Sequence, residues 1–425
     1  MNGPGGTDQR LRRRLGLLDA VVIGLGSMIG AGVFTALAPA AGAAGGALPL
    51  ALALAALVAY CNATSSARLA ARYPASGGTY VYGRERLGDF WGYLAGWGFV
   101  VGKTASCAAM ALTVGAYAWP EQAHAVAVAA VVALTAVNYG GVRKSALLTR
   151  LIVAVVLAVL AAVVVAALTS DRASLGRIDL AAGWTDAGPE GLLRAAGLLF
   201  FAFAGYARIA TLGEEVRDPA RTIPRAIPLA LGIALVVYAA VALAALAVLG
   251  AGGLAGAAAP LADAVRAAGV PGLAPVVRVG AVVAALGSLL ALILGVSRTT
   301  LAMARDRHLP HPLAAVHPRF GVPHRAELAV GAVAAVVAAT VDVRGAIGFS
   351  SFAVLVYYAI ANASAWTLPS AEGRRRRVVP AVGLLGCLAL ALALPLTSVL
   401  AGALVLAVGA AAYAVRHRGA APTGR

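Results

Sequence analysis

Long apolar segments recur along almost the whole chain, and they constrain its fold more than any other feature. They run from residue 17 to residue 415, and each is long enough to cross the roughly 30 Å hydrocarbon core of a bilayer as a helix. Of the 425 residues, 61% are hydrophobic and 12% are charged, which is about half the charged share of a soluble domain. The sequence therefore predicts an all-α polytopic membrane protein embedded in a lipid bilayer.

The apolar runs divide into twelve predicted membrane-spanning helices. We expect five of them in residues 15–170, five in 190–370 and two in 378–416, with cytoplasmic tails at 1–14 and 417–425. Because five is odd, the second set of five enters the membrane from the opposite side, which predicts an inverted repeat. The predicted spans are 17–41, 46–66, 90–118, 123–139, 147–168, 192–213, 226–249, 273–303, 327–342, 346–367, 379–396 and 398–415.

The positive charges are divided unevenly between the connecting segments. With the N-terminus inside, 25 of the 34 Lys and Arg residues fall in cytoplasmic segments, six in outer segments and three within spans. By the positive-inside rule, this predicts a protein of the cytoplasmic membrane with both termini in the cytoplasm. The net charge of +17 then indicates the orientation of the chain in the membrane and, secondarily, contact with anionic lipids. Nucleic acid is not an expected partner.

Residue types that would support an enzyme active site are not clustered. The six histidines lie in loops or at the ends of predicted spans, and the three cysteines lie in or at apolar runs. Membrane hydrolases and transferases need His, Asp or Glu clusters at the depth where they act. The sequence therefore predicts no enzyme, no metal site and no cofactor.

Glycines interrupt the first and the sixth predicted spans. The segment "GSMIGAG" (26–32) lies inside the first apolar run, and Gly205 lies inside the sixth, "LLFFAFAGYARIATLGEE" (198–215). Glycine costs a helix interior about 1 kcal/mol relative to alanine, and Gly-interrupted spans at matching places in two halves indicate a transporter site. A small-residue packing face is the alternative for the first span alone. The predicted helix-break residues are Gly26, Ser27, Gly30 and Gly205.

Four motifs in chain order resemble those of the amino acid–polyamine–organocation transporters. They are "GLGSMIGAGVF", "YPASGGTYVYGRERLGDFWGYLAGW", "FFAFAGYARIATLGEEVRDPARTIPRAI", and "LAMARDRHLP" followed by "HPRFGVPHRAE". The resemblance covers nearly the whole chain. It implies a LeuT-type fold, with ten helices in two inverted five-helix repeats, broken helices 1 and 6, and two peripheral helices.

The resemblance also implies how a substrate is held. The half-helix that begins near Ala31 and Gly32 presents N–H groups suited to a substrate carboxylate, and the carbonyl near Met28 accepts from a substrate ammonium. Similarity to family members places further ammonium contacts at the carbonyls of Phe201 and Ala204. We expect the substrate side chain to meet a mostly apolar or small set of residues, which favours neutral substrates: Lys103, Ser106, Phe201, Ala207 and Leu292.

Lys103 is the most informative single residue. It lies about thirteen residues, or ~20 Å, into the third span, where a charge costs about 2.5–3.5 kcal/mol. It can carry the coupled proton, bind an acidic substrate side chain, or serve as a structural amine capped by carbonyls of the broken helices. All seventeen carboxylates are predicted in loops or near span ends, which favours Lys103 as the proton carrier. A cation in the pocket argues against polyamines and cationic amino acids.

Other positions bear on coupling and gating. Sodium-coupled members of this fold use two hydroxyls on span 8, where this chain has Gly287 and Ser288, so Ser288 is the second coupling candidate beside Lys103. Arg208 and Arg298 lie nearer the cytoplasmic side, where their side chains can snorkel. The gate candidates are Glu214, Glu215, Arg217, Arg305 and Asp306.

These features together predict a permease that moves neutral amino acids by alternating access, with H⁺ as the coupling ion. Amino acid exchange is the nearest alternative mechanism. Sodium coupling and the transport of polyamines or organic cations are weaker alternatives. A channel is disfavoured because paired helix breaks in a twelve-span chain suit alternating access better.

Overall fold

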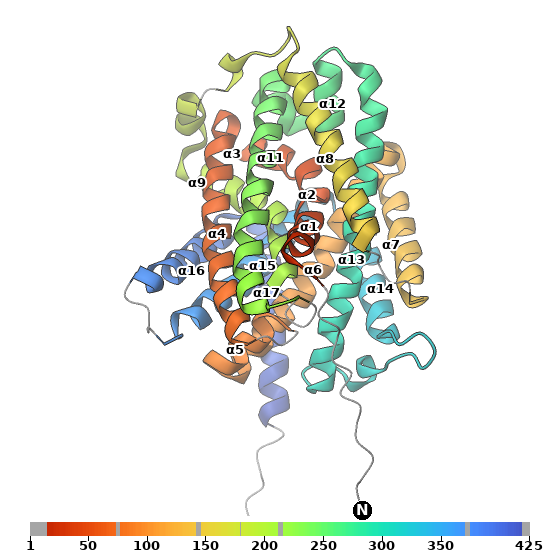
Figure 1. Cartoon of the computed structure of the whole chain (residues 1–425), viewed down its shortest axis with the longest axis vertical. Helices are drawn as coiled ribbons and strands as arrows, with labels where there is room; N and C mark the ends of the chain where they lie inside the picture. Colours follow the sequence, from red (N-terminus) through yellow and green to blue (C-terminus); the bar gives the residue numbers. More distant parts are fainter. Residues whose placement is uncertain are drawn as a thin grey trace, which may run out of the picture.

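The computed structural model describes residues 15–73, 77–141, 146–178, 180–210, 216–369 and 375–418. The helices and strands assigned within these residues are all helices, which confirms the predicted all-α fold (Figure 1). Leu15 and Val216 form an isolated β-bridge. The helices are α1 (Leu17–Met28), α2 (Ala31–Thr35), α3 (Leu37–Ala44), α4 (Leu48–Arg72), α5 (Thr79–Leu87), α6 (Asp89–Ala118), α7 (Ala123–Tyr139), α8 (Ala146–Leu168), α9 (Leu180–Phe203), α10 (Ala207–Ala210), α11 (Pro219–Gly256), α12 (Pro260–Ala267), α13 (Ala274–Arg305), α14 (His324–Thr340), α15 (Val343–Trp366), α16 (Arg375–Ala393) and α17 (Leu396–Arg418).

Ten of the described helical segments are long and apolar enough to cross a membrane, which confirms a multi-pass membrane protein. They correspond to predicted spans one to eight, ten and twelve. The ninth predicted span corresponds to α14, with 17 residues, and the eleventh overlaps the shorter apolar helix Arg377–Ala393. The predicted count of twelve is therefore not reached by length alone, and the inverted repeat and domain bounds stay predictions.

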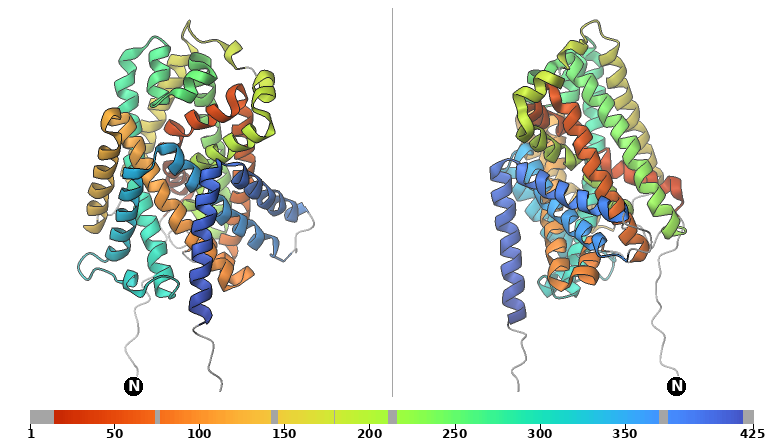
Figure 2. Two further views of the ribbon diagram at one scale, coloured as in Figure 1. Left: turned by 180° about the vertical axis from the view of Figure 1, so that it is seen from behind. Right: turned by 90° about the vertical axis from the view of Figure 1, so that its left-hand side faces the viewer.

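The helices differ in how deeply they are buried. In an 18-residue stretch of α15, 83% of residues are buried, against 17% in α17, and the right-hand view of Figure 2 shows α17 at the edge of the bundle. Small residues let the central helices approach closely: a Cβ on Gly102 of α6 would lie 2.7 Å from the Cβ of Ala353 on α15. The bundle core is thus built around α6 and α15.

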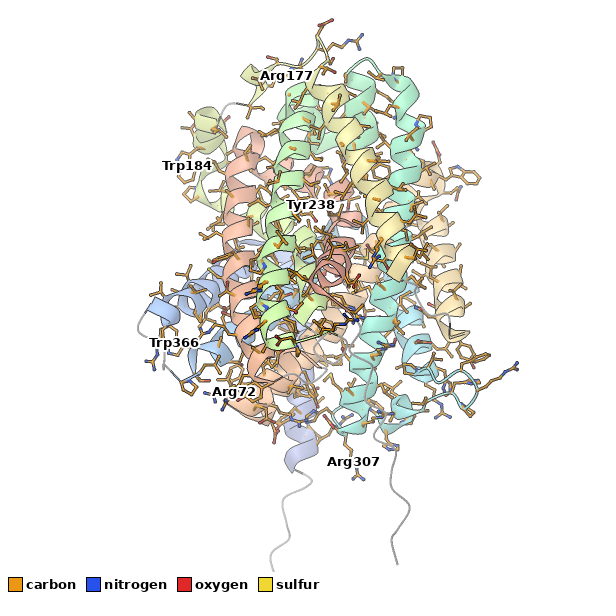
Figure 3. All side chains as sticks on the ribbon, viewed as in Figure 1. Arg72, Arg177, Trp184, Tyr238, Arg307 and Trp366 are labelled. Atoms are coloured by element: carbon orange, nitrogen blue, oxygen red, sulfur yellow. The ribbon has the colours of Figure 1, made fainter. Side chains whose placement is uncertain are left out.

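The two ends of the bundle carry different elements. At one end, called here the α5 end, lie α5, the last turn of α13 and the described end of α17 (Figure 1), and Arg416 of α17 donates to the carbonyl of His308 at 2.7 Å. The other end, called here the α12 end, carries α12 and the start of α13. Figure 3 places Arg72 and Arg307 toward the α5 end and Arg177 at the opposite end.

Candidate functional site

The first predicted span is interrupted in the structure. Helix α1 ends at Met28 and α2 begins at Ala31, while the N–H of Gly30 donates to the carbonyl of Met28 at 2.8 Å. A Cβ on Gly30 would lie 2.2 Å from Oγ of Ser288 on α13, so only glycine lets α13 approach this point. The break is shorter than predicted, because Gly26 and Ser27 remain helical and the Ser27 hydroxyl donates to the carbonyl of Ile23.

The sixth predicted span is interrupted as well. Helix α9 ends at Phe203, a 3-10 turn covers Ala204–Tyr206, and the short helix α10 follows. A Cβ on Gly205 would lie 2.2 Å from the carbonyl oxygen of Ser27 and 2.7 Å from the backbone nitrogen of Met28. The two interruptions therefore meet backbone to backbone, and Gly205 is the residue that allows it.

Tyr238 of α11 connects the two interrupted helices. Its hydroxyl lies 2.6 Å from the carbonyl oxygen of Met28 and 3.0 Å from that of Ala202, and it donates to these acceptors. Figure 3 shows Tyr238 in the middle of the bundle. Tyr238 could not be identified from the sequence, because a single tyrosine in an apolar run gives no local signal and its acceptor Met28 is 210 positions away.

Lys103 lies at the second interruption. Its Nζ donates to the carbonyl of Ala204 at 3.4 Å, and the hydroxyl of Tyr358 donates to the same carbonyl at 3.3 Å. The Lys103 side chain is almost fully buried. One carbonyl of the broken helix thus accepts from two side chains of neighbouring helices, which holds the turn in place.

A cavity of about 230 Å³ borders both interruptions. One wall is a single face of α6 and another is a single face of α13, since the lining residues of each recur every three or four positions. Among the described lining residues there are three cations, Lys103, Arg208 and Arg298, and no carboxylate. Arg208 and Arg298, expected to snorkel, line the cavity instead. The two faces comprise Phe99, Lys103, Ser106 and Met110 of α6, and Ser288, Ala291, Leu292, Gly295, Arg298, Thr299 and Ala302 of α13.

The structure brings most of the predicted site residues to this cavity. Those that line it are Ser27, Lys103, Ser106, Phe201, Ala204, Gly205, Ser288 and Leu292. Met28, Ala31 and Gly32 are not among the residues that line it, and a Cβ on Gly32 would lie 2.6 Å from Cα of Ala202 on α9. The side chain of Ala207 lies outside the described residues. The part of each residue in substrate binding stays a prediction.

At the α5 end, a polar cluster joins α5 to the end of α13. The Tyr80 hydroxyl donates to Asp306 at 2.5 Å, and Arg84 pairs with the same carboxylate at 2.8 Å. Nδ1 of His308 lies 2.9 Å from the Tyr80 hydroxyl. Burial and the neighbouring carboxylate raise the pKa of Tyr80, so the phenol stays protonated and donates. Tyr80 also lines the cavity.

The predicted gate residues are only partly represented in that cluster. Asp306 belongs to it, but its ion-pair partner is Arg84, which the sequence analysis did not name. Arg217 and Arg305 have exposed side chains. Glu214 and Glu215 lie outside the described residues. The gating role of all five stays a prediction.

The α12 end of the cavity is closed by packed helices. The buried Tyr117 of α6 donates to the carbonyl of Phe34 at 2.9 Å and accepts from the N–H of Leu261 on α12 at 3.3 Å. Arg278 donates to the carbonyl of Tyr117 at 3.0 Å. Because Tyr80 and Ala302 line the cavity toward the α5 end, the cavity extends from the interruptions to that end only.

Unwound backbone inside a membrane protein is stable only where protein buries it or a cavity solvates it. Here both interruptions border one cavity, which is the way secondary transporters hold a small solute near the bilayer midplane. In the described part of the chain, no group of three or more His, Cys, Asp and Glu residues could hold a metal ion. Fold and cavity together are those of a small-molecule transporter.

Comparison with known proteins identifies the family. The model of the amino acid permease family matches residues 15–414, and the chain belongs to this family. An uncharacterized transporter of Mycobacterium tuberculosis is 77% identical over 414 residues, 97% of this chain and 93% of the relative. The branched-chain amino acid permease BcaP of Bacillus subtilis is 25% identical over 443 residues, 97% and 94% of the two chains. The chloroplastic cationic amino acid transporter 7 of Arabidopsis thaliana is 28% identical over 381 residues, 84% and 65%. The protein is a transporter with amino acids as its substrate class.

Proposed function

We propose that the protein takes up neutral amino acids across the cytoplasmic membrane by alternating access, driven by H⁺. The observation that carries this proposal is that two interrupted helices meet beside one buried cavity. An α-amino acid offers a carboxylate and an ammonium group. Free N–H groups at a helix start and free carbonyls at a helix end suit these two charges.

The contacts around the breaks support one orientation of the substrate. The carbonyl of Met28 already accepts from Gly30 and Tyr238, and the carbonyl of Ala204 already accepts from Lys103 and Tyr358. The ammonium group is therefore proposed to meet the carbonyl of Phe201, a residue that borders the cavity. The carboxylate then points toward the first interruption, where α2 restarts at Ala31 and continues into α3.

The cavity lining supports a neutral side chain of small to medium size. Phe201, Leu292 and Met110 are apolar, and Ser106 is small. The volume of about 230 Å³ lies below the roughly 300–1,000 Å³ of sites for drug-sized ligands. The three cationic lining residues oppose cationic substrates by charge repulsion. Among the relatives, the one named for branched-chain amino acids fits this chain better than the one named for cationic amino acids.

The α5 end is proposed to face the cytoplasm, in agreement with the positive charges of its loops. The cavity extends from the interruptions toward that end and is closed at the α12 end. The structure then corresponds to an inward-facing state. The cluster of Tyr80, Arg84, Asp306 and His308 lies at the mouth through which substrate leaves.

Two predicted coupling residues make contacts that support positioning roles. The ammonium of Lys103 holds the carbonyl of Ala204. The Ser288 hydroxyl donates to the carbonyl of Gly26 at 3.3 Å, so this hydroxyl is engaged in closing α13 onto α1. With glycine at position 287, a sodium site at this place lacks its second hydroxyl. H⁺ is therefore the better candidate for the coupling ion.

Uptake by reconstituted protein tests the proposal. Proteoliposomes receive a panel of labelled alanine, serine, isoleucine, arginine and glutamate under an inward H⁺ or an inward Na⁺ gradient. We expect accumulation of the neutral amino acids with H⁺ only, up to about tenfold per coupled proton for each pH unit. Absence of amino acid flux under either gradient, in folded protein, refutes the proposed function.

Lys103→Met and Lys103→Arg separate the roles of the lysine in the same assay. If the ammonium positions the second interruption, Lys103→Met lowers exchange and accumulation together, and Lys103→Arg restores part of both. If it carries the coupled proton, Lys103→Met loses accumulation while counterflow exchange of labelled for unlabelled amino acid continues.

A further inference from the structure

A buried carboxyl group lies on α14, which packs against α13, one of the helices that line the transport cavity. Glu327, in the first turn of α14, is fully buried, with 0% of its surface exposed. Neither of its two carboxyl oxygens has a hydrogen-bond partner. The preference for Lys103 as proton carrier depended on all carboxylates lying in loops or near span ends. Glu327 does lie near a span end, but its complete burial makes it a second candidate for the proton site.

The surroundings of Glu327 are tightly packed. One turn further along α14, a Cβ on Gly331 would lie 2.5 Å from Oγ1 of Thr135 on α7. The Thr135 hydroxyl and Nδ1 of His324 are also buried without a partner. These two atoms and the two Glu327 oxygens make up four of the eight unpartnered buried side-chain atoms in the described chain. Unsatisfied polar groups are thus concentrated at the α7–α14 interface, and such groups require an explanation.

A second observation links this carboxyl to the cavity. Arg298 of the neighbouring helix α13 acts electrostatically on Glu327, and Arg298 lines the cavity. A buried carboxylate without a hydrogen bond or a paired cation is strongly unfavourable, whereas the neutral acid is tolerated. The observed geometry therefore suits protonated Glu327, with Arg298 directed to the cavity wall.

We propose that Glu327 is a proton-binding site of the transport cycle, and that its charge acts on the cavity through Arg298. When the O–H bond breaks and the proton leaves, the carboxylate attracts the flexible guanidinium of Arg298 away from the cavity wall. Binding of a proton releases it again. The step involves only proton transfer and depends on the proposed H⁺-driven uptake.

The other groups around Glu327 fit a proton site at this position. His324 lies one turn earlier on the same helix, at a spacing that makes side chains neighbours, and it is partly exposed. It therefore offers a route for protons from the α5 end. Arg298 is a charged group whose positive charge favours the ionised form of Glu327. Polar or titratable residues also lie on the elements that pack against α14. They are Thr135, Asn138 and Tyr139 on α7, Arg298 on α13, Thr104 on α6, and His311 and His317 in the α13–α14 connection, in addition to His324 and Arg325 on α14 itself.

The test compares Glu327→Gln with the wild type in proteoliposomes that contain a pH-sensitive dye. The probe is the labelled panel amino acid that the wild type exchanges fastest. Gln keeps the shape of Glu but cannot titrate. Glu190→Gln is the control, because the Glu190 side chain is 77% exposed at the other end of the bundle. We expect wild type and control to accumulate the probe up to about tenfold per coupled proton for each pH unit.

Net uptake by Glu327→Gln is expected to stop when the amino acid has nearly the same concentration inside and outside the proteoliposomes. No protons are expected to move with the amino acid in this variant. Its exchange continues but no longer changes with pH, and Glu327→Asp restores accumulation. In Arg298→Gln the midpoint of the pH profile of exchange moves to higher pH, because the cation that stabilises the carboxylate is gone.

Three results are distinguishable. Accumulation by Glu327→Gln equal to the wild type overturns the assignment of Glu327 and leaves H⁺-driven uptake standing. A pH midpoint unchanged in Arg298→Gln overturns the link to the cavity, even where Glu327→Gln fails to fold. A wild type that exchanges amino acids without H⁺-driven accumulation refutes the proposed coupling itself and Glu327 with it.

Discussion

Gly205→Ala should stop amino acid exchange in a protein that still folds. At this position the two interrupted helices touch through their backbones. The added Cβ would lie 2.2 Å from the carbonyl oxygen of Ser27, 2.4 Å from its carbonyl carbon and 2.7 Å from the nitrogen of Met28. No side-chain rotation relieves these contacts, because all three are backbone atoms. The interruptions must therefore separate.

The size of the effect follows from these distances. Van der Waals contacts without repulsion begin at a separation of about 3.5 Å between heavy atoms. The two backbones must therefore move apart by about 1 Å. Overpacking of this kind costs typically 1–3 kcal/mol, which leaves a large membrane bundle folded. A binding site, however, needs its groups within about 0.5 Å of their working positions. We therefore expect a modest loss of stability and a much larger loss of transport.

Counterflow exchange in proteoliposomes and thermal unfolding in detergent measure the two effects. Gly232→Ala in α11 is the matched control, because a Cβ there meets nothing within 4 Å and alanine favours a helix by about 1 kcal/mol. The control should exchange normally and unfold at the same or a higher temperature. Exchange by Gly205→Ala at the control rate would refute the view that the backbone contact builds the site.

Three further substitutions test other contacts. Tyr238→Phe removes the donor to the carbonyl of Met28 and should cost about 1–3 kcal/mol, seen as a lower unfolding temperature together with slower exchange. Asp306→Asn breaks the ion pair with Arg84. Because exposed ion pairs contribute up to about 1 kcal/mol, the rate of substrate release, measured as efflux, should rise by at most about fivefold. Asn362→Leu removes an amide that binds α4 side chains and should cost about 1–2 kcal/mol in thermal unfolding, with normal exchange per folded molecule.

Features encoded by local sequence patterns were predictable. The apolar run 123–139 matches α7 to the residue, and 90–118 differs from α6 by one residue. The glycines of the first and sixth spans marked both interruptions, because glycine inside an apolar helix is costly unless another backbone approaches. The motifs around them also indicated the family, which the comparison confirmed.

Contacts between distant segments were not predictable in the same way. Tyr238 and Tyr358 look like ordinary residues of apolar helices, yet each donates to a backbone carbonyl at an interruption. Their roles depend on how the helices are packed, which one sequence does not encode locally. The same reason explains why the sequence did not show that Met28, Ala31 and Gly32 would be absent from the residues that line the cavity.

The charged residues show why depth along a span is a poor measure of burial. Glu327 is near the start of its helix, yet it is fully buried in a helix that packs against α6, α7 and α13. Arg298 was judged shallow enough to reach the membrane surface, yet it lines the cavity. The burial of a charged residue in a helical bundle thus depends on the helices packed around it. If Glu327 is the proton site, its charge acts on the cavity through Arg298, a residue of the neighbouring helix that lines it.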